Sequence, residues 1–118
     1  LHPRVRRQRQ MCIRDRNIAD HGGLQVSYQA FKKATAAAPL EVKDGFTPEQ
    51  RFFLAYANVW ANNTRPEAIL QLTKIDVHSL GKWRVDAALP HIAAWYDAFG
   101  ITEKDPMYVP VEERISIW

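Results

Sequence analysis

The chain has 118 residues, with 16 basic and 13 acidic side chains and a formal net charge of +3. This length fits one small domain, and no run is apolar for long enough to span a bilayer. No signal peptide is recognisable, so the composition predicts neither a membrane segment nor a leader within these residues.

Residues 1–16 differ from the rest of the chain. They contain six arginines, one aspartate and the only cysteine. The run can be back-translated into DNA that closely resembles a transposase-based sequencing adapter, with Pro3-Arg4-Val5 at the place of its variable index. We therefore interpret residues 1–16 as a non-native, adapter-derived segment and exclude them from fold reasoning. The alternative interpretation is a disordered basic tail that binds nucleic acid.

Excluding this segment changes the charge balance. It removes six of the 16 basic residues and one of the 13 acidic residues, which leaves a formal net charge of −2. The remaining cations are scattered along the chain rather than clustered. We therefore expect neither nucleic acid nor an anionic membrane as a partner of residues 17–118.

The first helix is expected to run from about residue 16 to Ala38, where Pro39 ends it. One apolar stripe of this helix, at the spacing i, i+4, i+8, i+11, consists of Asp20, Leu24, Tyr28 and Phe31. A carboxylate on a buried stripe is costly unless it is paired or hydrogen-bonded. Asp20 therefore requires a partner from elsewhere in the protein.

The second helix has the strongest start signal. Thr47 is placed as its N-cap, Pro48 occupies the first helical position, and Gln50 can complete a capping box. Residues 52–60 are then apolar on nearly every side. This pattern is typical of a helix in the middle of a larger protein, and we assign its aromatic residues to the core.

Later elements are shorter. A short helix is expected to begin near Pro66, and residues 74–88 are expected to be irregular or extended. Residues 90–99 have the spacing of an amphipathic helix, with Gly100 as its C-terminal cap. The chain has more apolar surface than a domain of this length covers by itself. This predicts the C-terminal part of a larger domain, truncated at its N-terminus.

His78 and Arg84 are the most chemically suggestive pair. They lie six residues apart on the expected loop, and two donor groups held close together suit a polarised carbonyl or an oxyanion. The plainer interpretation is that His78 caps a turn and Arg84 pairs with a surface carboxylate. His21 and His91 read as partly exposed helical histidines and receive no role.

Several motifs, in order along residues 17–118, resemble the C-terminal end of the neprilysin-like zinc metallopeptidases. They are Asn-Ile-Ala-Asp-x-Gly-Gly-Leu at 17–24, Gln-Arg-Phe-Phe-Leu at 50–54, Val59-Trp60, Arg65-Pro66-Glu67, Asp76-Val77-His78-Ser79-x-Gly81 with Arg84, and a terminal tryptophan. Several motifs with the right spacing are more specific than any single one. The resemblance implies a mainly α-helical part of a larger metallopeptidase catalytic domain.

The resemblance also implies roles for single residues. In that family a glutamate precedes the first motif and binds the catalytic Zn²⁺ together with two histidines of an upstream His-Glu-x-x-His helix. Asp20 would orient a zinc-bound histidine, His78 would stabilise the oxyanion, and Arg84 would hold a substrate backbone carbonyl. The parent enzyme would hydrolyse oligopeptides and would require the missing N-terminal part of the same chain.

One departure from the family pattern concerns the metal. Arg16 occupies the position of the glutamate ligand, and a guanidinium has no lone pair to offer a metal. We therefore expect the 118-residue fragment to bind no catalytic zinc and to be inactive. The alternative is a catalytically dead relative, in which Arg16 is genuine and the protein serves as a peptide-binding or interaction domain. A third reading, a basic nucleic-acid-binding module, depends wholly on residues 1–16.

The end of the chain bears on the type of organism. It lacks the cysteine found near the end of animal members, which favours a bacterial-type enzyme. For such an enzyme we favour the periplasm, the cell envelope or the exterior, with the cytoplasm as the other option.

Overall fold

The structure, a computed structural model, describes residues 3–76 and 78–116. Its helices are α1 Pro3–Ala36, α2 Pro48–Val59, α3 Pro66–Ile75, α4 Gly81–Asp86 and α5 Ala93–Phe99, with short 3-10 helices η1 Leu89–His91 and η2 Val111–Glu113. Within these described ranges there is no strand, and the only β-pairing is an isolated bridge between Lys43 and Phe46. The prediction of a mainly α fold is confirmed. Two residues of the predicted motifs, Val77 and Trp118, lie outside the described part.

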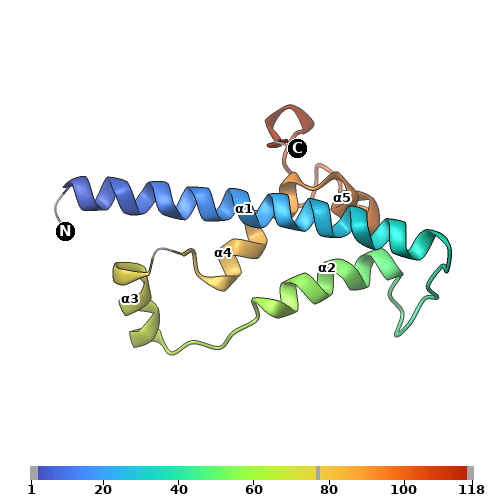
Figure 1. Cartoon of the computed structure of the whole chain (residues 1–118), viewed down its shortest axis with the longest axis horizontal. Helices are drawn as coiled ribbons and strands as arrows, with labels where there is room; N and C mark the ends of the chain where they lie inside the picture. The colour runs from blue at the N-terminus through green and yellow to red at the C-terminus, as the bar shows by residue number, and fades with distance from the viewer. Residues whose placement is uncertain (1–2, 77, 117–118) are drawn as a thin grey trace.

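α1 runs along the length of the molecule (Figure 1). In that view α2, α3 and α4 lie below it, and the C-terminal end of the chain lies above it. The core forms where the second half of α1 meets α2, η1 and α5. Its buried residues are Leu24, Phe53, Ala88, Leu89, Ile92, Trp95 and Tyr96.

The predicted start of the first helix near residue 16 is wrong, because α1 begins at Pro3. Arginine and glutamine are good helix formers, so residues 3–16 carry no local signal that opposes a helix. The predicted end is late by two residues, since α1 ends at Ala36. No helix in the described part of the chain is long and apolar enough to cross a membrane.

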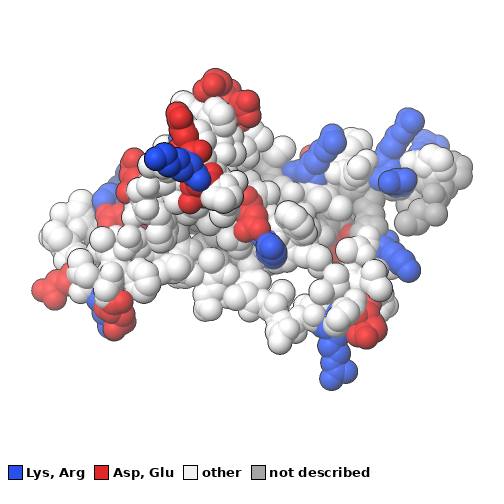
Figure 2. Space-filling model, turned by 180° about the vertical axis from the view of Figure 1, so that it is seen from behind, with Lys and Arg blue, Asp and Glu red and all other residues white. Residues whose placement is uncertain are grey.

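Charged side chains are unevenly distributed. Figure 2 shows Lys and Arg gathered at the end of the molecule where α1 begins, while acidic and basic groups are interspersed over the rest of that face. The excess of positive charge therefore belongs to the first part of α1. This agrees with the sequence, in which residues 1–16 hold six arginines and one aspartate while the remaining residues have a formal net charge of −2.

The predicted start of α2 is confirmed. The Thr47 hydroxyl accepts a hydrogen bond from the Gln50 backbone N–H at 3.2 Å, and the Gln50 side chain accepts one from the Thr47 N–H at 3.0 Å. The Gln50 amide also donates to the carbonyl of Ala98 at 2.9 Å, which ties α2 to α5. Phe53 is the buried residue of α2, whereas Leu54 and Val59 are 41% and 72% exposed.

The irregular segment predicted for residues 74–88 is partly wrong, because α4 forms at Gly81–Asp86. Glycine at its first position weakens the local helix signal. The close approach of α4 to the end of α2 requires that glycine, because a Cβ on Gly81 would lie 2.4 Å from the carbonyl oxygen of Trp60. The helix predicted for residues 90–99 is interrupted at Ile92, where η1 ends and α5 begins. Gly100 caps α5 in the left-handed conformation, as predicted (φ 63°).

His21 is buried, with 4% of its surface exposed, so the sequence-based expectation of a partly exposed histidine is wrong. Its ring lies edge-on to that of His91, with centroids 5.9 Å apart. His91 Nδ1 in turn accepts a hydrogen bond from the backbone N–H of Ile115 at 3.2 Å. Burial lowers the pKa of His21, opposed by a hydrogen bond to the His91 backbone. Burial, His21 and Arg114 lower the pKa of His91.

These shifts predict a pH-dependent stability. A histidine whose pKa is lower in the folded state binds its proton first in the unfolded state, where its pKa is about 6.5. The stability contributed by neutral His21 is therefore fully present above about pH 6.5 and is lost as the pH falls through the folded-state value. We expect urea unfolding at pH 5.5 to show a lower midpoint than at pH 7.5, and His21→Gln to reduce that difference. His78→Gln, at an exposed histidine, is the control. An undiminished difference in His21→Gln would contradict the assignment to His21.

Candidate functional site

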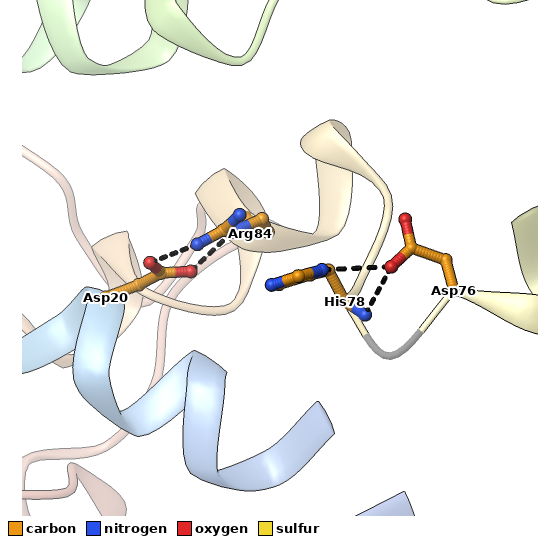
Figure 3. Close-up of polar contacts among 4 residues, drawn as sticks. All are labelled: Asp20, Asp76, His78 and Arg84. Atoms are coloured by element: carbon orange, nitrogen blue, oxygen red, sulfur yellow. Dashed lines mark hydrogen bonds and ion pairs between the residues drawn. The ribbon is translucent and has the colours of Figure 1, made fainter. Parts of the chain in front are cut away.

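Asp20 and Arg84 form a bidentate ion pair that joins α1 to α4 (Figure 3). The Arg84 Nε–H donates to Oδ2 of Asp20 at 2.5 Å, and Arg84 Nη2 donates to Oδ1. The side chains of Arg84 and Asp20 are only 15% and 14% exposed. The partner required by Asp20 therefore lies in this chain, 64 residues further along.

Two aromatic residues at the C-terminal end of α2 also contact Arg84. The guanidinium carbon lies 3.7 Å from the centroid of the Trp60 ring, a cation–π contact. The Tyr56 hydroxyl donates to the backbone carbonyl of Arg84 at 3.2 Å. The hydrogen bonds to Asp20 raise the pKa of Arg84, so the guanidinium remains charged. They use Nε and Nη2, which leaves Nη1 outside the ion pair.

His78 is held by Asp76. One carboxylate oxygen of Asp76 accepts the backbone N–H of His78 at 2.9 Å and lies 2.9 Å from the imidazole Nδ1. A carboxylate at Nδ1 favours a proton on that nitrogen and fixes the ring orientation. Figure 3 shows the opposite edge of the ring pointing toward the Asp20–Arg84 pair. The imidazole is 44% exposed, so a bound molecule can reach it.

Two cavities adjoin these groups. His78 and Arg84 line the same cavity of about 200 Å³, together with Trp60. Asp20 lines a second cavity of about 420 Å³, between α1 and α2. The structure thus brings Asp20 into contact with Arg84 and places His78 and Arg84 on one cavity. This arrangement presents a fixed guanidinium and an oriented imidazole to a carbonyl or an oxyanion.

The described residues do not build a metal site by themselves. No group of three or more His, Cys, Asp or Glu side chains is placed to hold an ion in the ranges 3–76 and 78–116. Arg16 lies on α1 one turn before Asp20, half-buried, and a guanidinium cannot be a ligand. The donor set of the described residues therefore does not fit a zinc ion.

Sequence reasoning missed three residues of this arrangement. The sequence assigns Tyr56 and Trp60 to the core, although their spacing of four residues places the C-cap residue Trp60 one turn after Tyr56. Asp76 received no role, although its place two residues before His78 was a local signal for a hydrogen-bonded turn. Only the three-dimensional arrangement shows that the α2 pair contacts Arg84.

Gly81 sets the distance between α4 and α2, and this can be tested. Gly81→Ala places a methyl group 2.4 Å from a backbone oxygen that cannot move independently, so α4 must shift. We expect a loss of about 1–3 kcal/mol in the free energy of unfolding, measured with urea. Gly23→Ala is the matched control, because its Cβ meets nothing within 4 Å and a helical Gly→Ala change gains about 1 kcal/mol. Equal effects of the two variants would contradict the steric account.

Comparison with known proteins identifies relatives of this chain. The model of Peptidase family M13 matches residues 3–115. Membrane metallo-endopeptidase-like 1 from Homo sapiens is 39% identical over 105 residues, and neutral endopeptidase from Lactobacillus helveticus is 34% identical over 102 residues. Each match covers 86% of this chain but only 13% and 14% of the relative.

A solved structure shows the same fold. The zinc metalloprotease Zmp1 of Mycobacterium tuberculosis, in its open state, superposes with a TM-score of 0.81 at 31% identity. That match covers 86% of this chain and 16% of the other. The family match spans nearly the whole chain and includes the elements that carry Asp20, His78 and Arg84. The chain therefore belongs to peptidase family M13.

Proposed function

We propose that this chain forms one wall of the active site of a zinc-dependent endopeptidase that hydrolyses peptide bonds in oligopeptides. The observation that carries the proposal is the fixed Arg84 guanidinium beside the oriented His78 imidazole, on one cavity, in a chain of family M13. The chain spans about one seventh of its curated relatives. The remaining catalytic groups would therefore come from the rest of the parent protein.

Each side chain has a role that its surroundings support. Arg84 holds a substrate backbone carbonyl through Nη1, which points outside its ion pair with Asp20. His78 presents Nε2 to the developing oxyanion as a hydrogen-bond donor, while Asp76 holds the Nδ1 edge and keeps the ring oriented. Asp20 faces the cavity between α1 and α2, where it can also orient a histidine supplied by the His-Glu-x-x-His helix.

Zinc belongs to the parent enzyme in this proposal. It would polarise the peptide carbonyl and lower the pKa of a bound water, but its ligands are not provided by the described residues. The partner that completes the site is the remaining part of the same polypeptide. Leu54 and Val59 of α2 are exposed apolar side chains that it would cover.

The origin of residues 1–16 is a separate proposal. The relatives cover 86% of the chain, which is the share that residues 17–118 make up, whereas the family model match begins at residue 3. We infer that Arg16 replaces a glutamate at the junction between adapter and gene. The nucleotide sequence across codons 1–20 decides this, because codons other than those of the adapter would overturn it.

The alternative function is a catalytically dead relative that binds peptides. It requires a genuine Arg16 and is favoured only by the sequence as written. Recovery of the upstream gene separates the two proposals. A glutamate codon at position 16 and an intact His-Glu-x-x-His motif support the peptidase, and a genomic arginine codon supports the dead relative.

Activity measurements test the main proposal directly. The full-length protein with glutamate at position 16 should cleave a short fluorogenic peptide, and a chelator should abolish the cleavage until zinc is restored. The 118-residue chain should not cleave it, with or without added zinc, because it lacks the zinc ligands. An inactive full-length protein with bound zinc would contradict the proposal, and so would cleavage by the 118-residue chain.

The role of His78 predicts a loss of turnover. In the full-length enzyme His78→Ala should lower kcat by about 10²- to 10³-fold, as expected for the loss of one oxyanion donor. His21→Gln is a matched control, because that histidine is buried away from the cavity that His78 lines. Steady-state kinetics on both variants, with circular dichroism to check folding, measure the difference. An unchanged kcat in His78→Ala would remove His78 from this role.

A further inference from the structure

We propose that Tyr56 and Trp60 are positioning residues, which hold the Arg84 guanidinium in the orientation needed to bind a substrate carbonyl. The inference rests on the proposed function for its effect on catalysis. The positioning itself is a property of this chain and can be measured without activity. Both residues lie at the end of α2, outside the motif that carries His78 and Arg84.

Three contacts constrain Arg84 in three different ways. The Asp20 carboxylate holds one edge of the guanidinium, through Nε and Nη2, and so fixes its rotation within its own plane. The guanidinium carbon lies over the Trp60 ring, 3.7 Å from its centroid, so the ring limits movement of the guanidinium in that direction. The Tyr56 hydroxyl holds the backbone carbonyl of Arg84, where the side chain originates. Together they fix the direction of the remaining nitrogen, Nη1.

The Tyr56 contact is suited to a permanent role. Burial raises the pKa of Tyr56, and the charge of Asp20 raises it further. The phenol therefore keeps its proton and remains a donor to the Arg84 carbonyl. Trp60 offers the largest aromatic face, which gives the strongest attraction to a guanidinium.

The aromatic residues in and at the end of α2 have two structural roles: one packs in the core, and two contact Arg84. Phe53 is 1% exposed and packs in the core with Leu24 and Trp95. Tyr56 and Trp60 are only partly buried and contact the helix that carries Arg84. A long arginine side chain has several rotatable bonds, and its binding of a substrate is stronger when those bonds are already fixed. The α2 pair provides this pre-organisation.

The first experiment uses the 118-residue chain itself. In the NMR spectrum the Arg84 Nε–H should be shifted by the Trp60 ring current and should exchange slowly with water. Trp60→Leu should remove the shift and speed the exchange at least tenfold, whereas Trp60→Phe should retain most of both effects. Trp83→Leu is the matched control: it removes the same residue type from α4, beside Arg84, at a position 58% exposed. Unchanged Arg84 signals in Trp60→Leu would overturn the proposal.

The second experiment uses the full-length enzyme with glutamate at position 16. Trp60→Leu should lower kcat/KM for an oligopeptide about tenfold, Trp60→Phe should restore most of it, and Tyr56→Phe should lower it about threefold. Trp83→Leu should leave it unchanged. An equal loss in the leucine and phenylalanine variants of Trp60 would overturn the positioning role. If the unmodified full-length enzyme is inactive, the proposed function fails, and the Arg84 signals alone decide whether the α2 pair positions the side chain.

Discussion

The ion pair between Asp20 and Arg84 determines how α1 and α4 are placed relative to each other at this site. It removes two charges from most of their contact with water. The resulting loss of hydration free energy is offset only when the geometry of the pair is good and additional contacts are made. Here two parallel hydrogen bonds and the cation–π contact with the Trp60 ring offset that loss. The pair therefore stabilises one relative placement of α1 and α4, and with it the cavity that His78 and Arg84 share.

Local features of this chain could be predicted from its sequence, while the pairings between distant residues could not. The capping box of Thr47 and Gln50 spans four residues, so its geometry follows from their order. The stripe that contains Asp20 predicted a partner but not its identity, because the partner lies 64 residues away. The sequence does not predict α4 because the helix is short and begins at Gly81, and glycine lowers any local helix signal.

The histidines show the same distinction. His78 follows Asp76 by two residues, and the turn that joins them is local. His21 follows Asp20 directly, and nothing in the helical spacing indicates that η1 would bring the His91 ring against it. The resemblance to a family added roles for Asp20, His78 and Arg84, and the family itself is confirmed by the match over residues 3–115. The aromatic contacts of Arg84 follow from neither source.

The contact between Gly81 and Trp60 has a consequence for variation in this protein. At that point α4 meets α2 through main-chain atoms, since a single methyl group on Gly81 would already collide with the Trp60 carbonyl. At this point the gap between the two helices is thus limited by main-chain atoms, with the Asn62 side chain also close by. Exposed side chains of α2 such as Leu54 take no part in this backbone contact. Variation is therefore most restricted at Gly81, where even the smallest side chain would force the two helices apart.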